Sequence, residues 1–406
     1  MKYVIVLGDG MADVPVPALG GHTPLEAANK PHIDHLAQNG ICGTVQTVPI
    51  GMPPGSDTAN MSVLGFSPRI YYSGRSPLEA VALGIEVAPE DVTFRTNLVC
   101  VSEEPAYEDK TMIDFSAGEI STAEADSLIR TLQKELFTDD DLRLYPGISY
   151  RHCLVKKGGS TGTVLTPPHD ITGKPVRDCL PHGTYGARLA ELMRRSYDIL
   201  KDHPINRARI AAGKNPANSV WFWGEGTKPK LKPLEQIYGI RGGMICAVDL
   251  LKGLALCAGM QTVEVPGATG GMTTNYRGKG EAALELLKSG CDLVYIHIEA
   301  PDECGHHGDA AAKVAAIEAI DRDIVGYLYA ELTQAKEPFR MLVTPDHPTP
   351  IHLMTHTADP VPFVLYDSEQ PQSGTSRYTE AEASRTGLFL PEGPMLMHRL
   401  IFGETE

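Results

Sequence analysis

The sequence predicts an α/β protein with a doubly wound, mostly parallel sheet and a smaller α+β domain inserted into it. Two observations support this prediction. Near both ends of the chain, short apolar runs that end in Gly, Asp or Pro alternate with helical patterns, which is typical of buried parallel strands joined by helices. The middle of the chain lacks this alternation and is rich in turns and short strand-like runs.

Four apolar runs mark the expected strands of the main sheet. They are residues 3–7, 293–298, 340–344 and 362–366. Helical patterns are expected over residues 276–288, 310–335 and 395–401. Because ligands of open α/β sheets bind beyond the carboxyl ends of the strands, we expect functional residues in the loops that follow these runs.

The change of pattern along the chain also predicts the domain boundaries. We expect residues 1–100 and 243–406 to form the α/β domain, and residues 101–242 to form an inserted domain that covers the substrate. Within the insert, a capping-box pattern at Ser121 predicts the start of a helix. Strand-like runs follow at 151–156 and 161–165, and a second helix is expected over 185–200.

Composition excludes several classes of protein. Hydrophobic residues make up 42% of the 406 residues, enough for a sizeable core. The net charge of −15 argues against a nucleic-acid-binding surface, and no apolar run is long enough for a membrane helix. The apolar run at the N-terminus is too short for a signal peptide, and the eight cysteines form no CxxC pair. We therefore expect a cytoplasmic protein with reduced thiols that binds neither nucleic acid nor membranes.

Carboxylates and imidazoles cluster around the ends of the expected strands. These candidate metal ligands are Asp9, Asp302, His306, Asp346, His347 and His356. Such side chains, gathered at one edge of a sheet, suit two divalent metal ions. Each residue alone is more typical of a turn or a helix cap, so a dinuclear site and ordinary loop residues both remain open at this point.

A glycine turn before Ser56 adds a candidate nucleophile. In Pro54-Gly55-Ser56, the hydroxyl residue opens an expected short helix, whose positive end favours an alkoxide or an attached phosphoryl group. An ordinary serine cap is the alternative interpretation. Only a nearby metal ion would make this serine a nucleophile at neutral pH.

Taken together, the motifs resemble a known family. They read GDGMAD, GSDTANM, GRSPLEA, TFRTNLV, PGATG with TNYRGKG, EAPDECGHHGD, TPDH and HTADPVPF. In this order and over essentially the whole chain, they resemble the archaeal-type branch of the cofactor-independent phosphoglycerate mutases, which belong to the alkaline-phosphatase superfamily. The resemblance implies an alkaline-phosphatase-like fold and no requirement for 2,3-bisphosphoglycerate.

The resemblance also implies roles for the clustered residues. One divalent ion would be held by Asp9, Ser56, Asp346 and His347, and the other by Asp302, His306 and His356. Manganese is the expected metal, with magnesium, cobalt or zinc as alternatives. Ser56 would be the nucleophile, with Thr58 as its rival. Asn60 departs from the family, which usually has histidine at this turn, so the function of that histidine would be supplied differently.

The insert and one further lysine supply the expected substrate ligands. By resemblance these are Arg151, His152, His169, Asp170 and Arg177, with Lys252 in the place of a phosphate-facing lysine. Solvated surface residues are the alternative interpretation of the Arg and His residues in the insert.

The expected function is the interconversion of 3-phosphoglycerate and 2-phosphoglycerate through a phosphoserine, with a small phosphorylated metabolite as the partner. A homoserine kinase-like activity is the alternative, because TAEADSLI, PHDITGKP and NPANSVWFWGEG in the insert resemble sequences assigned to that activity. A phosphatase or sulfatase would need an insert that admits water, and a non-catalytic binding protein would have lost some of the clustered residues.

Overall fold

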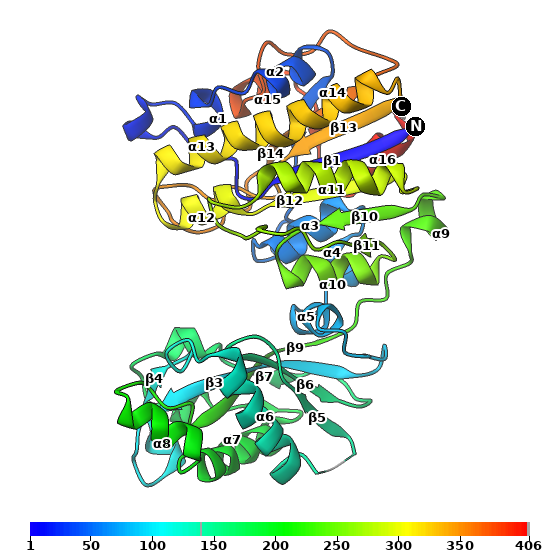
Figure 1. The fold of residues 1–406 in the computed structure, drawn as a ribbon. Coiled ribbons are helices and arrows are strands. Elements are labelled where there is room, and N and C mark those ends of the chain that lie inside the picture. Colours follow the sequence, from blue (N-terminus) through cyan, green and yellow to red (C-terminus); the bar gives the residue numbers. More distant parts are fainter. Residues whose placement is uncertain (139, 404–406) are drawn as a thin grey trace. The chain divides into compact units, whose positions relative to one another are not determined.

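A computed structural model describes residues 1–138 and 140–403 of the chain. The chain divides into two compact units, one formed by Met1–Tyr72 with Leu231–Glu406 and the other by Ser73–Lys230 (Figure 1). We call the first the sheet unit and the second the inserted unit. An insertion was expected, but its boundaries differ from the expected 101–242.

Strand pairing explains the shifted boundaries. Strand β3 (Val92–Val101) was expected to belong to the first domain, yet it pairs antiparallel with β6 (Arg151–Lys156) and β9 (Ser219–Thr227). At the other boundary, helix α9 (Leu234–Tyr238) already packs in the sheet unit, where Leu234 N donates to Ala258 O at 2.9 Å. An apolar run does not reveal which sheet it joins, so the sequence misplaced both crossings.

The sheet unit is built on one eight-stranded sheet in the order β11-β10-β12-β1-β13-β14-β2-β15. The strands are β1 (Lys2–Gly8), β2 (Ile41–Val45), β10 (Gly242–Ile245), β11 (Gln261–Thr262), β12 (Leu293–Ile298), β13 (Phe339–Thr344), β14 (Val361–Asp367) and β15 (Phe389–Leu390). All four expected strands are present. Only β14 runs against its neighbours, so the sheet is mostly parallel, as predicted.

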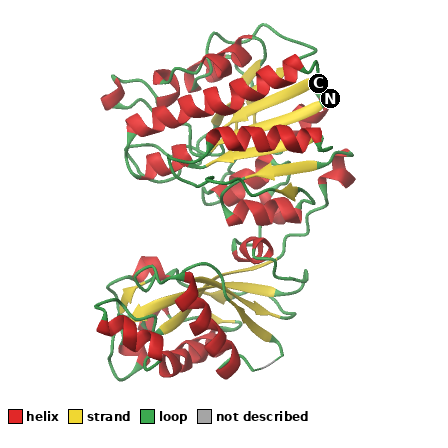
Figure 2. Ribbon diagram, viewed as in Figure 1, coloured by secondary structure: helices red, strands yellow, loops and turns green. Residues whose placement is uncertain are grey.

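Helices cover the sheet on both faces in the doubly wound arrangement (Figure 2). They are α1 (Pro24–Ala27), α2 (Pro31–Gln38), α3 (Ser56–Val63), α4 (Pro68–Tyr71), α10 (Asp249–Cys257), α11 (Tyr276–Lys288), α12 (Ala300–His306), α13 (Ala310–Ile320), α14 (Gly326–Gln334), α15 (Glu380–Arg385) and α16 (Met395–Phe402), with a 3-10 turn at Pro17–Leu19. The helix expected over 310–335 is interrupted by a π-helical turn, η5 (Asp321–Val325). There the carboxylate of Asp321 accepts from Ile33 N at 2.7 Å and so satisfies the start of α2.

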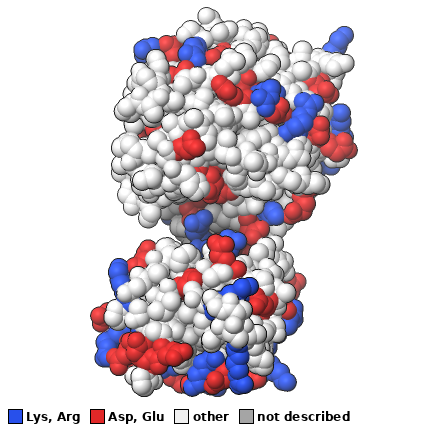
Figure 3. All heavy atoms as spheres, turned by 60° about the vertical axis from the view of Figure 1, so that its left-hand side comes forward, with Lys and Arg blue, Asp and Glu red and all other residues white. Residues whose placement is uncertain are grey.

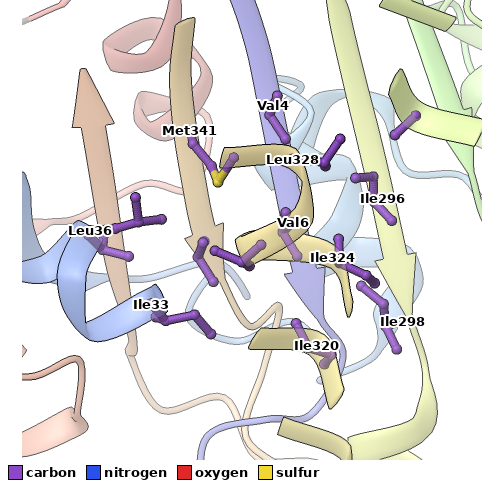
Figure 4. Packing of buried hydrophobic residues seen from close by; sticks show 14 of the residues in the cluster. Val4, Val6, Ile33, Leu36, Ile296, Ile298, Ile320, Ile324, Leu328 and Met341 are labelled. Carbon is purple, nitrogen blue, oxygen red and sulfur yellow. The ribbon is translucent and has the colours of Figure 1, made fainter. Parts of the chain in front are cut away.

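Side chains along the central strands alternate between the two faces of the sheet, so that one face is hydrophobic and the other carries polar groups. Figure 4 shows Val6 of β1 and Ile296 of β12 directed at Ile320 and Ile324 on the helical layer, and all four side chains are buried. Burying each aliphatic side chain stabilises the fold by about 1.5–3 kcal/mol. Because successive side chains of a strand point to opposite faces, His297 points to the other face of the sheet.

The inserted unit has its own antiparallel sheet in the order β4-β3-β6-β5, with β9 also paired to β3. Helix α6 (Thr122–Glu135) begins after Ser121, whose Oγ accepts from Glu124 N at 3.4 Å, as the capping pattern predicted. The remaining elements are α5 (Ser76–Ala82), η2 (Tyr107–Asp109), β4 (Met112–Asp114), β5 (Leu142–Tyr145), β7 (Thr163–Val164), η3 (Pro168–Ile171), η4 (Arg177–Cys179), β8 (His182–Gly183), α7 (Gly186–Leu200) and α8 (Pro204–Ala211).

The surface charge, the cysteines and the helix lengths can be compared with what the composition predicted. On the face shown in Figure 3, Lys and Arg side chains are interspersed with Asp and Glu, and no continuous basic surface is visible there. All eight cysteines are free, as expected. Among the described helices, none has the length and apolar character needed to span a membrane.

Candidate active site

Loops at one edge of the large sheet bring the predicted ligands together. The parallel register pairs Gly8 with Ile298 and Leu7 with Thr344, so β1, β12 and β13 end at the same level. Asp9 follows β1, Asp302 and His306 lie on α12 after β12, and Asp346-His347 follows β13. His356 precedes β14, and because β14 is antiparallel its beginning lies at this same edge.

Asp302 lies at the centre of one cluster. Its Oδ2 is 3.3 Å from His306 Nε2 and its Oδ1 is 3.4 Å from His356 Nε2. The two Nε2 atoms are only 2.9 Å apart, and the rings of His347 and His356 lie 4.1 Å apart between centroids. Three imidazoles and a carboxylate thus converge on a small volume.

Asp9, Ser56 and His347 form the adjoining part of the site. Ser56 Oγ donates to Asp9 Oδ2 at 3.2 Å and lies 3.3 Å from His347 Nε2. His347 Nε2 is also 3.5 Å from Asp9 Oδ1. That Oδ1 atom is buried and has no hydrogen-bond partner among the described residues, which leaves it available as a ligand.

The carboxylate of Asp346 is fully buried and accepts three hydrogen bonds. Its Oδ1 accepts from the backbone N–H groups of Gly10, at 3.1 Å, and His347, at 2.9 Å. Its Oδ2 accepts from Asn60 Nδ2 at 2.8 Å. These bonds fix the carboxylate before any ligand arrives.

Gly10 allows the first loop to approach α12 this closely. Its φ of +61° lies in the left-handed region, and a Cβ there would lie 2.7 Å from Asp302 Oδ1 and 2.8 Å from Asp302 Cα. Any side chain at this position would therefore push Asp302 out of the site.

Buried carboxylates lie close together in the site, so a bound cation would be electrostatically favourable. Burial raises the pKa of Asp9 well above its usual value, and the nearby Asp346 and Asp302 raise it further. Burial alone would also raise the pKa of Asp302, but hydrogen bonds with His306 and His356 hold it below the usual range. His347 is fully buried, and burial lowers its pKa, which favours the neutral imidazole that binds metals.

Among the described residues, two groups of side chains have the donors and spacing of a metal site, namely Asp302 with His347 and His356, and Asp9 with His297 and Asp346. Nitrogen and carboxylate oxygen donors suit manganese, cobalt or zinc. The expected division placed His347 with Asp9 and Asp346, and its Nε2 is indeed 3.5 Å from both Asp9 Oδ1 and Asp346 Oδ2. His347 therefore lies between the two groups.

The structure separates the two rival hydroxyls. Ser56 is the first residue of α3, and the cap position before it is Gly55, so Ser56 is not an ordinary serine cap. Thr58 is buried, and its Oγ1 donates to Gly55 O at 3.0 Å, back into the preceding turn. Of these two hydroxyls, the one that contacts the clustered ligands is that of Ser56.

Lys252 lies near two carboxylates, whereas the buried Lys279 donates to a backbone carbonyl oxygen. Lys252 Nζ donates to Glu264 at 2.6 Å and lies 3.7 Å from Asp249, so two carboxylates already neutralise it. Lys279 was not anticipated. It is fully buried on α11 and donates to His297 O at 2.9 Å, and burial lowers its pKa to about 8.

The inserted unit gathers part of the expected substrate ligands around Trp223. The His169 ring lies 5.3 Å from the Trp223 ring, and the guanidinium of Arg95 lies 3.9 Å above the Trp223 ring. Burial lowers the pKa of Arg95, which pairs with Glu79 at 2.9 Å and has Arg151 as a like-charged neighbour. Sequence reasoning missed Arg95, although it lies in the TFRTNLV motif.

The other candidates of the inserted unit have different surroundings. His152 is buried and accepts from Gly147 N at 3.0 Å through Nδ1, and burial lowers its pKa to about 3. Asp170 is exposed, 3.6 Å from His169. Arg177 is exposed and pairs with Asp109. Of the expected ligands, His169 thus contacts Trp223, and Arg151 is a charged neighbour of Arg95.

Sequence reasoning also missed polar residues behind the ligands. His297 Nε2 is 2.9 Å from Asp9 Oδ2, and Thr349 donates to Asp302 Oδ1. Tyr295 donates to Asn60 Oδ1 at 2.7 Å. The available signal was the pair of polar rings, two residues apart, inside the apolar run LVYIHI.

Comparisons with known proteins agree with this geometry. A sequence model described as 2,3-bisphosphoglycerate-independent phosphoglycerate mutase matches residues 37–206. The enzyme of that name from Methanosarcina barkeri is 48% identical over 95% of this chain and 96% of its own length. The one from Methanothrix thermoacetophila is 48% identical over 99% of this chain and all of its own length.

Solved structures agree as well. A Pyrococcus horikoshii protein superimposes with a TM-score of 0.82 at 29% identity, covering 100% of this chain and 98% of that one. The cofactor-independent phosphoglycerate mutase of Thermoplasma acidophilum gives a TM-score of 0.69 at 28% identity, covering 98% and 99%. The resemblance found in the motifs is confirmed: this chain belongs to the family of 2,3-bisphosphoglycerate-independent phosphoglycerate mutases.

Proposed function

We propose that this protein interconverts 3-phosphoglycerate and 2-phosphoglycerate by way of a phosphoserine on Ser56. The proposal rests on one observation above all. In a chain related to such mutases over its whole length, Ser56 Oγ lies 3.2 Å from Asp9 and 3.3 Å from His347, at the first position of α3. A nucleophile there has acidic and imidazole ligands on one side and a helix N-terminus on the other.

Family membership and the donor set make this a divalent-metal enzyme. We assign Asp9, Ser56, Asp346 and His347 to one ion and Asp302, His306 and His356 to the other, with manganese as the metal. Bound cations would lower the pKa of the serine hydroxyl and neutralise charge on the phosphoryl oxygens. The orphaned Asp9 Oδ1 and the converging imidazole nitrogens fit such ions.

The protein's own groups have distinct tasks in the two transfers. Ser56 Oγ gives up its proton and attacks phosphorus, so that the bond to the glycerate oxygen breaks and phosphoserine forms. The released alkoxide takes up a proton, and the glycerate then offers its other hydroxyl for the reverse transfer. The N-terminal N–H groups of α3 favour the negative charge on Ser56 in both steps. Water must be excluded, since hydrolysis would release free phosphate.

The inserted unit would bind the carboxylate of the substrate. Arg95 stacks on Trp223 and is held by Glu79, so its planar donors are ordered and suit a bidentate carboxylate contact. Arg151 and His169 remain proposed contributors. His152 is buried, Arg177 is exposed to solvent, and Lys252 lies near two carboxylates, so we give them a smaller share. A cytoplasmic location remains a prediction.

Phosphorus NMR tests the proposed reaction. Metal-stripped protein is mixed with 3-phosphoglycerate, and 2-phosphoglycerate is expected only after manganese is added, without free phosphate. A second tube with homoserine and ATP tests the kinase alternative, and O-phosphohomoserine in that tube alone would overturn the mutase assignment. Accumulation of free phosphate would instead indicate a phosphatase.

The nucleophile is tested with a matched pair of variants. Ser56→Ala should reduce turnover to below about one part in 10⁴, because the variant lacks the proposed nucleophile. Thr58→Ala should stay within a few-fold of wild type, since Thr58 Oγ1 is bonded to Gly55 O. Mass spectrometry of the quenched wild-type reaction should find the phosphoryl group on Ser56. Full activity of Ser56→Ala would rule out the phosphoserine.

A further inference from the structure

Strand β12 carries the side chains of Tyr295 and His297 on the face opposite to the hydrophobic core. Ile296 and Ile298 pack toward the helical layer of Figure 4, so Tyr295 and His297 point to the other face. Tyr295 is fully inaccessible and His297 is 1% exposed. Buried polar side chains in a central strand are costly unless they are hydrogen-bonded, and each of these contacts a different part of the active site.

His297 holds Asp9. Its Nε2 lies 2.9 Å from Asp9 Oδ2, and the neighbouring register pairs Leu7 with His297 across the parallel strands. Ser56 Oγ also donates to that same Oδ2. The other oxygen, Oδ1, is left buried without a hydrogen-bond partner among the described residues, facing His347 at 3.5 Å.

Tyr295 holds Asp346 through one intermediary. Its hydroxyl donates to Asn60 Oδ1 at 2.7 Å, and Asn60 Nδ2 then donates to Asp346 Oδ2 at 2.8 Å. Accepting from the tyrosine fixes which way the Asn60 amide points. Asn60 Nδ2 also donates to Ser56 O at 2.8 Å, so the amide connects the start of α3 to the carboxylate.

The surroundings of His297 indicate a hydrogen-bond donor rather than a metal ligand. A metal-bound histidine normally donates its second N–H to an acceptor. His297 Nδ1 is buried and has no such partner in the described part of the chain. A tautomer with the proton on Nδ1 would bury an unsatisfied donor, whereas the tautomer with the proton on Nε2 makes a short bond to Asp9.

We propose that His297 and the Tyr295–Asn60 pair are positioning residues that orient the Asp9 and Asp346 carboxylates for the metal they share. This inference rests on the proposed function for its metal, but it concerns ligand geometry and not the substrate. In the metal-free protein, the two carboxylates are already placed by β12 and α3. The strand thus carries the outer layer of the site on one face and the hydrophobic core on the other.

The first test measures manganese binding to the metal-stripped full-length protein by titration calorimetry. His297→Asn should weaken binding of the ion assigned to Asp9 and Asp346 about 10–100-fold, because the shorter amide does not reach Asp9. His297→Gln places an N–H near the former Nε2 and should recover most of that affinity. Wild-type affinity in His297→Asn would overturn the proposal, as would equal losses in Asn and Gln variants.

Tyr295→Phe tests the contact of Tyr295 with Asn60 and Asp346, and it has a matched control. Removing its hydroxyl frees the Asn60 amide and should weaken manganese binding several-fold. The Tyr276 hydroxyl is also buried but has no partner among the described residues, so Tyr276→Phe should leave the affinity unchanged. Equal effects of the two phenylalanine variants would show that loss of a buried hydroxyl, not positioning, matters.

Cobalt spectra separate a positioning role from direct ligation. In cobalt-loaded protein, His297→Gln should keep the visible absorption bands of the wild type, because the set of bound nitrogens is unchanged. Loss of a nitrogen ligand in these spectra would make His297 a metal ligand and overturn the proposal. If manganese binds as expected but phosphoglycerate is not converted, the proposed function fails and the positioning role stands.

Discussion

Two ion pairs, one in each unit, differ strongly in how far their side chains are exposed to solvent. In the sheet unit, Lys313 and Asp13 are completely buried, 2.8 Å apart, behind the loops that carry the ligands. In the inserted unit, Arg177 and Asp109 form an ion pair in which both side chains are more than half exposed. Buried charges fix one geometry, whereas exposed charges can rearrange, so we expect chemistry to be set by the first unit and substrate choice by the second.

The buried pair should give the largest effect on stability. Lys313 Nζ also donates to Thr349 O at 2.9 Å, so it ties the loop after β1 to the loop after β13. Lys313→Met leaves Asp13 buried without its partner and should lower the free energy of unfolding by about 3–5 kcal/mol. Urea denaturation of the metal-free protein measures this loss.

A double variant provides the control for this prediction. Asp13→Leu combined with Lys313→Met removes both charges and should recover much of the lost stability. A single Lys313→Met variant as stable as wild type would mean that the buried pair does not hold these loops.

Arg95 should give the largest effect in the inserted unit. Arg95→Met keeps the apolar stem against Trp223 but removes the charged donors. We expect KM for phosphoglycerate to rise about 10–100-fold with kcat changed only a few-fold, the loss of about 1.4–2.7 kcal/mol of binding. Steady-state kinetics of the variant measure both constants, and an unchanged KM would remove Arg95 from the proposed substrate site.

His152 should make stability depend on pH. Burial lowers its pKa from 6.5 to about 3, so the folded state keeps it neutral while the unfolded state takes up a proton below pH 6.5. The stabilising contribution is complete above pH 6.5 and decreases as the pH falls toward 3. At pH 5 the loss is about 2 kcal/mol.

Comparing unfolding at pH 7 and pH 5 measures this contribution. His152→Gln should destabilise the protein less at pH 5 than at pH 7. Parallel pH profiles for wild type and His152→Gln would contradict the assignment.

The smallest effect is expected for Arg177→Ala. Exposed ion pairs contribute less than about 1 kcal/mol, so stability and KM should both stay close to wild type. A tenfold rise in KM would return Arg177 to the substrate site and weaken the contrast between the two units.

Much of the sheet unit could be predicted from the sequence because its signals are local. The runs 3–7, 293–298 and 340–344 end in chemistry-bearing loops, and all three are parallel strands ending at one edge. The fourth run, β14, is antiparallel. It still brings His356 to that edge, because the loop before an antiparallel strand starts where its parallel neighbour ends.

Domain boundaries and the residues behind the ligands could not be predicted in this way. Strand β3 looks like any buried strand, and only its pairing with β6 and β9 places it in the inserted unit. Arg95 and His152 are both polar residues in apolar strands. The packing around them, not their spacing, leaves one beside Trp223 and buries the other.

The order of the motifs in the chain was therefore enough to identify the fold class and the family, and to propose the ligand residues that the structure brings together at one edge of the sheet. Tertiary structure alone decided that Ser56 and not Thr58 contacts the ligands, that Lys252 is neutralised, and that His297 contacts Asp9. The reason is physical. Ligand types and strand periodicity are local properties of the sequence, whereas a hydrogen-bond partner 288 positions away in the chain depends on which strands lie side by side.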